Sequence, residues 1–175
     1  MQMAAMLAGI ALVAWLFAHV EVEIEGPAGW AASLPVSFRV EQHWALDWFW
    51  GGRPMTGYHA WVFAFMAAMF HLPMLLIWRW TPRLQARCAA AVMLFWIIED
   101  ALWFAVNPHF GWQGLRPGAP GEAGAAWWHT RWLLGLPVDY WQFGILGGGL
   151  LWWGCGQPRT PQPAPADGLP LANDR

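Results

Sequence analysis

Four long apolar stretches constrain this chain more than any other feature of its sequence. They cover residues 3–20, 58–80, 86–107 and 136–156. Each is close to the roughly 20 residues that an α-helix needs to cross about 30 Å of hydrocarbon. Because a backbone inside lipid must satisfy its own hydrogen bonds, we expect each stretch to be helical. The sequence therefore predicts an all-α integral membrane protein, a four-helix transmembrane bundle within a domain of residues 1–156.

The composition supports a membrane location and argues against one class of partner. Only 11% of the residues are charged, against about 25% in an ordinary soluble domain. The nine basic residues are all arginines and are outnumbered by eleven acids, so we expect no basic surface for nucleic acid. Seventeen tryptophans suit the boundary between lipid headgroups and hydrocarbon. The expected partner is the lipid bilayer.

Arginines predict the orientation of the chain in that bilayer. The short link between the second and third stretches is crowded with them: Arg79, Arg83 and Arg87. The positive-inside rule places such a link in the cytoplasm. Residues 21–57 and 108–135 then form extracytoplasmic loops, and both termini are cytoplasmic. The plasma membrane is the predicted location.

The two ends of the chain carry different signals. No positive segment precedes the first stretch and no small-x-small cleavage site follows Ala18, which favours a retained helix over a cleaved signal peptide. Residues 157–175 are polar and rich in proline. Such a composition cannot bury a core, so we expect a disordered cytoplasmic tail.

The first extracytoplasmic loop contains two alternating segments. Apolar and acidic residues alternate over residues 20–25, and a second alternation covers residues 36–41. A period of two is typical of strands. A helix would instead place Glu21 and Glu25 together with like charges, whereas a hairpin lets Arg39 face the glutamates. The sequence predicts a short β-hairpin.

Glu99 and Asp100 lie in the middle of the third stretch. An acid at this depth costs roughly 3 kcal/mol, so it needs pairing, a proton, water or a cation. Helical spacing predicts one inward-facing stripe, made of Trp96, Asp100, Trp103 and Asn107. We name Glu99 and Asp100 as candidate catalytic groups. His71 lies at a similar depth on the second stretch, where it either meets these acids or is a histidine satisfied by neighbouring backbone.

A second polar group gathers at the extracytoplasmic ends of the predicted helices. Carboxylates and histidines that converge from several elements can bind a metal or act as an acid and base. Anchoring at the membrane interface is the alternative interpretation. The group consists of Glu21, Glu23, Glu25, His59, Asn107, His109, His129, Asp139 and Tyr140. As metal ligands we name His59, Glu99, Asp100, His109 and His129, and as further polar site candidates His71, Asn107, Asp139 and Tyr140.

Three functional hypotheses follow from these residues. The leading one is a membrane metalloprotein, with iron, copper or zinc as cofactor, acting as an oxidoreductase or hydroxylase on a lipid-like small molecule. The second is a transporter or proton-relay module that uses Glu99, Asp100 and His71. The third is a non-catalytic subunit or assembly factor, whose partner would be another membrane protein or a second copy of the chain.

A set of segments points to a known group of proteins: residues 23–26 with 29–31, 56–59, and 99–104 with 107–111. They resemble those of an uncharacterised family of small multi-pass bacterial membrane proteins. The resemblance covers most of the chain and implies a bacterial inner-membrane protein with the topology given above. It implies no particular activity.

Overall fold

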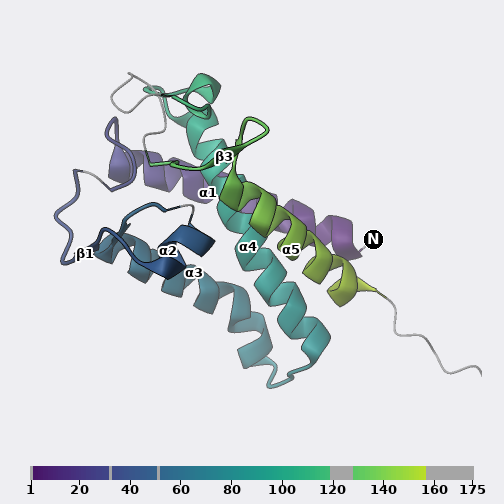
Figure 1. Ribbon diagram of the computed structural model, residues 1–175. Helices are drawn as coiled ribbons and strands as arrows, with labels where there is room; N and C mark the ends of the chain where they lie inside the picture. The colour runs from purple at the N-terminus through teal and green to yellow at the C-terminus, as the bar shows by residue number, and fades with distance from the viewer. Residues whose placement is uncertain (1, 32, 51, 119–127, 157–175) are drawn as a thin grey trace, which may run out of the picture.

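The computed structural model is mostly helical (Figure 1) and describes residues 2–31, 33–50, 52–118 and 128–156. The predicted tail at 157–175 lies outside the described residues. The described helices are α1 (Gln2–Glu25), α2 (Trp44–Phe49), α3 (Gly57–Leu76), α4 (Pro82–Val106) and α5 (Val138–Cys155), with a 3-10 turn at Trp112–Gly114. Two small antiparallel sheets pair β1 (Arg39–Val40) with β2 (Met55–Thr56), and β3 (Trp132–Leu133) with β4 (Leu136–Pro137).

Three of the described helices, α1, α3 and α4, are long and apolar enough to cross a membrane. They correspond to the first three predicted stretches, with shifted ends. Two of these helices begin at a threonine cap. The Thr56 hydroxyl accepts from the His59 N–H at the start of α3, and the Thr81 hydroxyl accepts from the Leu84 N–H at the start of α4. The fourth predicted stretch forms α5, which has 18 residues.

The predicted hairpin is wrong in one of its two strands. Residues 20–25 continue α1 as helix, and Glu21 and Glu25 lie together on its buried face. Their like charges are tolerated because each carboxyl has hydrogen-bond donors of its own, described below. The second alternating segment does contain a strand, β1, but its partner is β2. A two-stranded sheet therefore exists in this loop without using the acidic segment.

Helix α4 is central, because α1, α3 and α5 all pack against it. Helix α5 approaches it closely at two glycines. A side chain at Gly147 would meet Leu94 at 3.1 Å, and one at Gly154 would meet Arg87 at 2.9 Å. The larger apolar core lies along these contacts and includes Ile10, Ala14, Met66, Ala90, Ala91, Leu94, Phe95 and Leu151.

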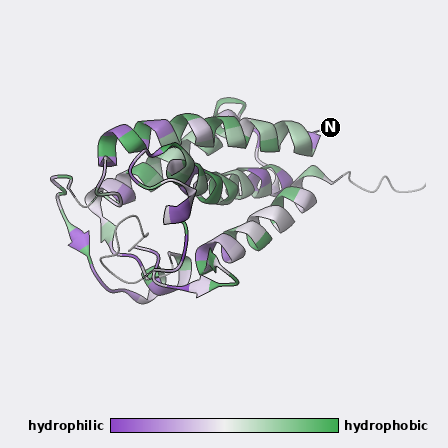
Figure 2. Cartoon of the chain, turned by 90° about the horizontal axis from the view of Figure 1, so that it is seen from above, coloured by the Kyte–Doolittle hydropathy of each residue, from purple (hydrophilic) through white to green (hydrophobic). Residues whose placement is uncertain are grey.

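The two ends of the helices differ in chemistry. At one end, Arg87 Nε donates to the Gly154 carbonyl at 2.8 Å and Arg83 donates to the Trp153 carbonyl at 3.0 Å. These cations bind the carbonyl end of α5, where the helix dipole is negative. We call this the arginine end. At the other, α1 and α4 finish and α3 and α5 begin, and hydrophilic residues gather in the loops beyond α1 (Figure 2). We call it the polar end.

Candidate functional site

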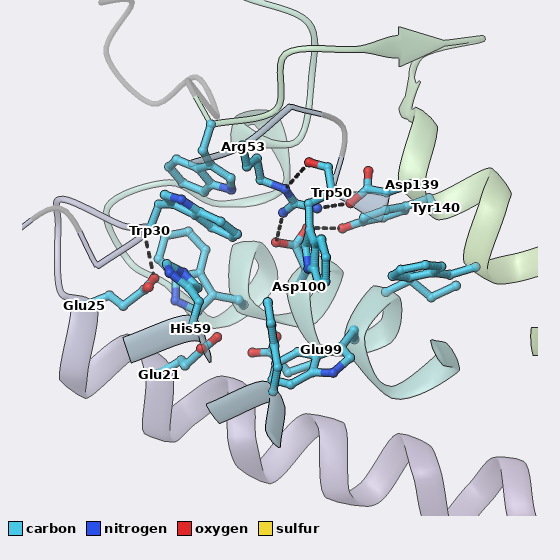
Figure 3. Close-up of a pocket in the computed structure, with 16 residues that line it drawn as sticks. Glu21, Glu25, Trp30, Trp50, Arg53, His59, Glu99, Asp100, Asp139 and Tyr140 are labelled. Carbon is cyan, nitrogen blue, oxygen red and sulfur yellow. Dashed lines mark hydrogen bonds and ion pairs between the residues drawn. The ribbon is translucent and has the colours of Figure 1, made fainter. Parts of the chain in front are cut away.

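The polar end encloses a pocket of about 50 Å³ (Figure 3). One buried water needs roughly 10–15 Å³ by this kind of measure, so the pocket has room for a few waters or one small group. Its lining combines five carboxyl groups with one guanidinium and many rings: Glu21, Glu25, Trp30, Trp50, Arg53, His59, Phe63, Trp96, Ile97, Glu99, Asp100, Trp103, Trp128, Asp139, Tyr140 and Phe143.

Glu21 and Glu99 form a carboxyl pair at the deep side of the pocket. Figure 3 shows the two carboxyl groups lying close to one another. Two buried carboxyl groups this close can hydrogen-bond to one another when one of them is protonated. Tyr58 holds the pair in place, since its hydroxyl donates to Glu21 Oε1 at 3.1 Å. Glu99 is only 2% exposed, and its Oε1 has no hydrogen-bond partner among the described residues.

Glu25 is held one turn further along α1 by backbone donors. The N–H groups of Trp30 and Ala31 donate to its two oxygens at 2.9 and 2.7 Å. Both donors have positive φ angles, 45° and 48°, which non-glycine residues rarely adopt. The Glu25 carboxylate therefore stabilises a strained turn. This turn places the Trp30 ring over His59, with ring centroids 3.9 Å apart.

Arg53 is the buried cation of the polar end. Its guanidinium forms an ion pair with Asp139 and lies 3.6 Å from Asp100 Oδ1. The same group lies over the Trp30 ring, 4.7 Å from its centroid, in a cation–π contact. Burial lowers the pKa of Arg53, while the neighbouring Asp100 carboxylate opposes that shift. An arginine stays charged under both influences, so Arg53 neutralises part of the acid group.

Asp100 is further bound by two donors. The Tyr140 hydroxyl donates to Asp100 Oδ2 at 2.5 Å, and His129 Nε2 lies 3.1 Å from the same atom. Burial holds the pKa of His129 below its ordinary value, and the Asp100 carboxylate opposes the shift only in part. We infer a neutral imidazole whose Nε2–H donates to Asp100. Asp100 is thus fully engaged by the protein itself.

An aromatic layer lies below the polar groups. On each of the four long helices, the residue four positions deeper than a polar group of the pocket is aromatic. Four residues span about 6 Å of helix, so the rings form a floor one turn beneath the acids. The pairs are Glu21 with Phe17, His59 with Phe63, Asp100 with Trp96, and Asp139 with Phe143. Phe63 and Trp96 pack edge to face at 4.6 Å, and Phe17 and Trp96 at 6.1 Å. The floor separates the pocket from the apolar core.

The predicted site residues fall into three groups in the structure. His59, Glu99, Asp100, Asp139 and Tyr140 line one pocket, and His129 bonds to one of them. Asn107 is buried nearby and donates from Nδ2 to the Gly26 carbonyl at 3.2 Å. The other two lie apart.

His109 is exposed, and its backbone N–H donates to Asn107 Oδ1 at 2.9 Å. His71 lies toward the arginine end, with Nδ1 2.7 Å from the Ala67 carbonyl and Nε2 2.8 Å from Gln85 Nε2. Both ring nitrogens of His71 are therefore satisfied locally, as in the plainer of the two interpretations of this residue.

Metal binding stays a prediction. Within the described ranges, no three His, Cys, Asp or Glu side chains are arranged to hold a metal ion. Arg53 already supplies a positive charge to Asp100, one of the predicted ligands.

The sequence reasoning missed Arg53, Trp30 and Tyr58. The acids at the predicted helix ends could have pointed to Arg53, because such a group of acids needs a cation nearby. Arg53 lies in the same loop region, between Gly52 and Pro54.

Comparison of the chain with protein-family models, with curated proteins and with solved structures finds no match. Any functional conclusion must therefore come from the pocket itself.

Proposed function

We propose that the chain is a multi-pass protein of a bacterial inner membrane, that α1, α3, α4 and α5 cross the bilayer, and that the polar end faces away from the cytoplasm. Exposed tryptophans at both ends support this, since such rings anchor at the two interfaces. At the arginine end they are Trp78, Trp80, Trp152 and Trp153, and at the polar end Trp44, Trp48 and Trp112. Arginines in the link between α3 and α4 favour a cytoplasmic arginine end.

The pocket, we propose, is an acid–base catalytic site. One observation carries this proposal: the buried Glu99 lies beside Glu21 and has an unpartnered oxygen in a pocket. Such a pair can give a proton to a bound group and take one back. Glu99 would transfer the proton at Oε1, while Glu21 would share it. Tyr58 positions Glu21.

A lipid-like substrate fits the surroundings of this acid pair. The floor of the pocket is aromatic, and the helices that carry it have exposed apolar faces. A molecule dissolved in the membrane could bring a small polar group to Glu99 while its chain stays against rings. The small volume of the pocket, about 50 Å³, supports a small reacting group.

Untargeted lipid mass spectrometry would test this proposal. Membranes from cells that make the wild type are compared with those from cells that make Glu99→Gln, which keeps the shape of the side chain but cannot exchange a proton. Glu23→Gln is the matched control, because Glu23 is an exposed acid on the same end of α1 as Glu21. Relative to membranes from cells that make Glu99→Gln, we expect an altered lipid composition in cells that make the wild type or Glu23→Gln. Identical profiles for the wild type and Glu99→Gln would contradict the proposal.

A metal centre is the second candidate. It is favoured by the excess of carboxyl groups over guanidinium in the lining. Of the predicted ligands, His59, Glu99 and Asp100 line the pocket, and these side chains would have to move to hold a metal, because no three such groups of the described residues are arranged for one. Metal analysis of the purified full chain tests it, and the expected result for this candidate is a stoichiometric transition metal that is lost in Glu99→Gln. Less than one-tenth of an equivalent in the wild type would contradict it.

A proton or ion path through the helices has weaker support. Below the aromatic floor lies an apolar core that contains Phe95 and Leu94, and His71 beyond it bonds to Ala67 and Gln85. No polar group of the described residues in this core would carry a proton between the two ends.

A further inference from the structure

We propose that the pocket recognises the primary ammonium group of a single-chain membrane amphiphile. This names the substrate class of the acid–base site and so rests on the proposed function.

Four of the five carboxyl groups in the lining already have donors from the protein. Glu21 accepts from the Tyr58 hydroxyl at 3.1 Å. Glu25 has two backbone N–H groups. Asp139 has the Arg53 guanidinium. Asp100 has Tyr140 and His129. These acids need nothing from a ligand.

Glu99 is different. It is buried beside Glu21, and its Oε1 has no partner among the described residues. Arg53 balances only one of the remaining carboxylates, which leaves an excess of negative charge in the lining. A ligand that donates hydrogen bonds and carries positive charge therefore fits, whereas a carboxylate or phosphate would be repelled.

The size of the pocket narrows the choice of cation. A primary ammonium is about as large as a water molecule and fits a space of about 50 Å³. A trimethylammonium group is several times larger and cannot donate to Glu99 Oε1. The walls also suit a cation, because Trp30 already carries the Arg53 guanidinium on its face at 4.7 Å.

The chain of the amphiphile would lie on the aromatic floor. Phe63, Trp96, Ile97 and Phe143 belong to the pocket lining and come from α3, α4 and α5. They are one turn deeper than the polar groups, toward the apolar part of the helices. An amine at Glu99 would thus lie beside apolar side chains, which favours an amphiphile over a small water-soluble amine.

Binding would also move a proton. Two buried acids this close are stabilised by a proton on one of them. When the ammonium group donates to Glu99, its positive charge stabilises the carboxylate, so that proton leaves to water. The ligand keeps all of its own protons. The affinity should therefore rise with pH as long as the amine itself stays protonated.

Binding measurements on the full chain in phosphatidylcholine nanodiscs test the proposal. The probes share one chain and differ in the head: dodecylamine, dodecanol and dodecyltrimethylammonium. We expect saturable binding of dodecylamine by calorimetry, at least about tenfold tighter than that of the other two, after subtraction of protein-free nanodiscs. In Glu99→Gln the affinity for dodecylamine should fall by at least about tenfold, and in Glu23→Gln it should not change.

Two results would overturn the ammonium assignment: dodecanol or dodecyltrimethylammonium binding as tightly as dodecylamine, or an unchanged dodecylamine affinity in a folded Glu99→Gln. If Glu99→Gln does not fold, the ranking of the three probes on the wild type decides alone. If dodecanol binds as tightly as dodecylamine and its binding is lost in Glu99→Gln, the ammonium assignment is wrong and the acid–base site is still supported. Dodecylamine binding with no lipid change in cells would instead support an amine-binding site and remove the catalytic role.

Discussion

At the scale of single residues, the polar end depends most on Arg53. Five carboxyl groups line one pocket, and without a cation so many buried acids would repel one another. Arg53 links acids of α4 and α5 to the Trp30 turn. One loop residue thus holds together three segments that are far apart in the sequence.

Replacing Arg53 should destabilise the protein strongly. Arg53→Met keeps much of the side-chain volume but leaves Asp139 and Asp100 without their cation, and removing one partner of a buried ion pair costs about 3–5 kcal/mol. Arg39→Met is the matched control, because Arg39 pairs with Glu41 on the surface, where such a pair contributes about 0–1 kcal/mol. Thermal unfolding in detergent measures both. Equal effects of the two substitutions would contradict the role given to Arg53.

His129 should make stability depend on pH. Burial holds its pKa in the folded protein below the ordinary value of 6.5, so on acidification the unfolded chain takes up a proton first. The free energy of unfolding should therefore fall as the pH drops below about 6.5, toward the lower pKa of the folded state. In His129→Gln this part of the slope should disappear, while His109→Gln, at an exposed position, should keep it. Unfolding midpoints between pH 5 and 8 measure the difference, and parallel curves for wild type and His129→Gln would exclude His129 as the cause.

At the scale of helices, hydropathy located the long elements but not their ends. Apolar length alone identifies α1, α3 and α4. The alternation at residues 20–25 predicts a strand because its period is two. It does not show that Tyr58 from α3 and the turn after α1 supply donors to Glu21 and Glu25 in a helix. The pocket was only partly predictable for the same reason. Helical spacing placed Asp100 on an inward stripe, yet the pairing of Glu99 with Glu21 depends on how α1 packs against α4.

Two neighbouring glycines of α5 should respond differently to the same substitution. A side chain at Gly147 would meet Leu94 at 3.1 Å, whereas at Gly148 nothing of the described structure lies within 4 Å. Gly147→Val should therefore push α5 away from α4 and destabilise the protein by about 1–3 kcal/mol. Gly148→Val carries the same helix propensity change without the clash. Unfolding in detergent measures the stability of the two variants. If Gly147→Val loses no more stability than Gly148→Val, the α4–α5 contact can relax.

At the scale of the whole molecule, charge and chemistry are divided between two ends. Arg83 and Arg87 bind the carbonyls that finish α5, so the arginines at that end also have a structural role. The acids, the buried Arg53 and the strained Trp30 turn lie at the other end. A protein arranged in this way would present its pocket to only one side of a membrane, and the sidedness can be measured.

Cysteine labelling in intact cells should reveal that sidedness. In a background where Cys88 and Cys155 are replaced by serine, we expect a membrane-impermeant maleimide to label Glu41→Cys, which is exposed at the polar end. Arg79→Cys, exposed in the link between α3 and α4, should be labelled only after the cells are permeabilised, because positively charged links stay in the cytoplasm. Labelling of Arg79→Cys alone in intact cells would reverse the orientation, and labelling of both would mean that the helices do not separate the two ends across a bilayer. The acid pocket could then not receive its ligand from the outer leaflet, so this measurement also bears on how an amphiphile reaches Glu99.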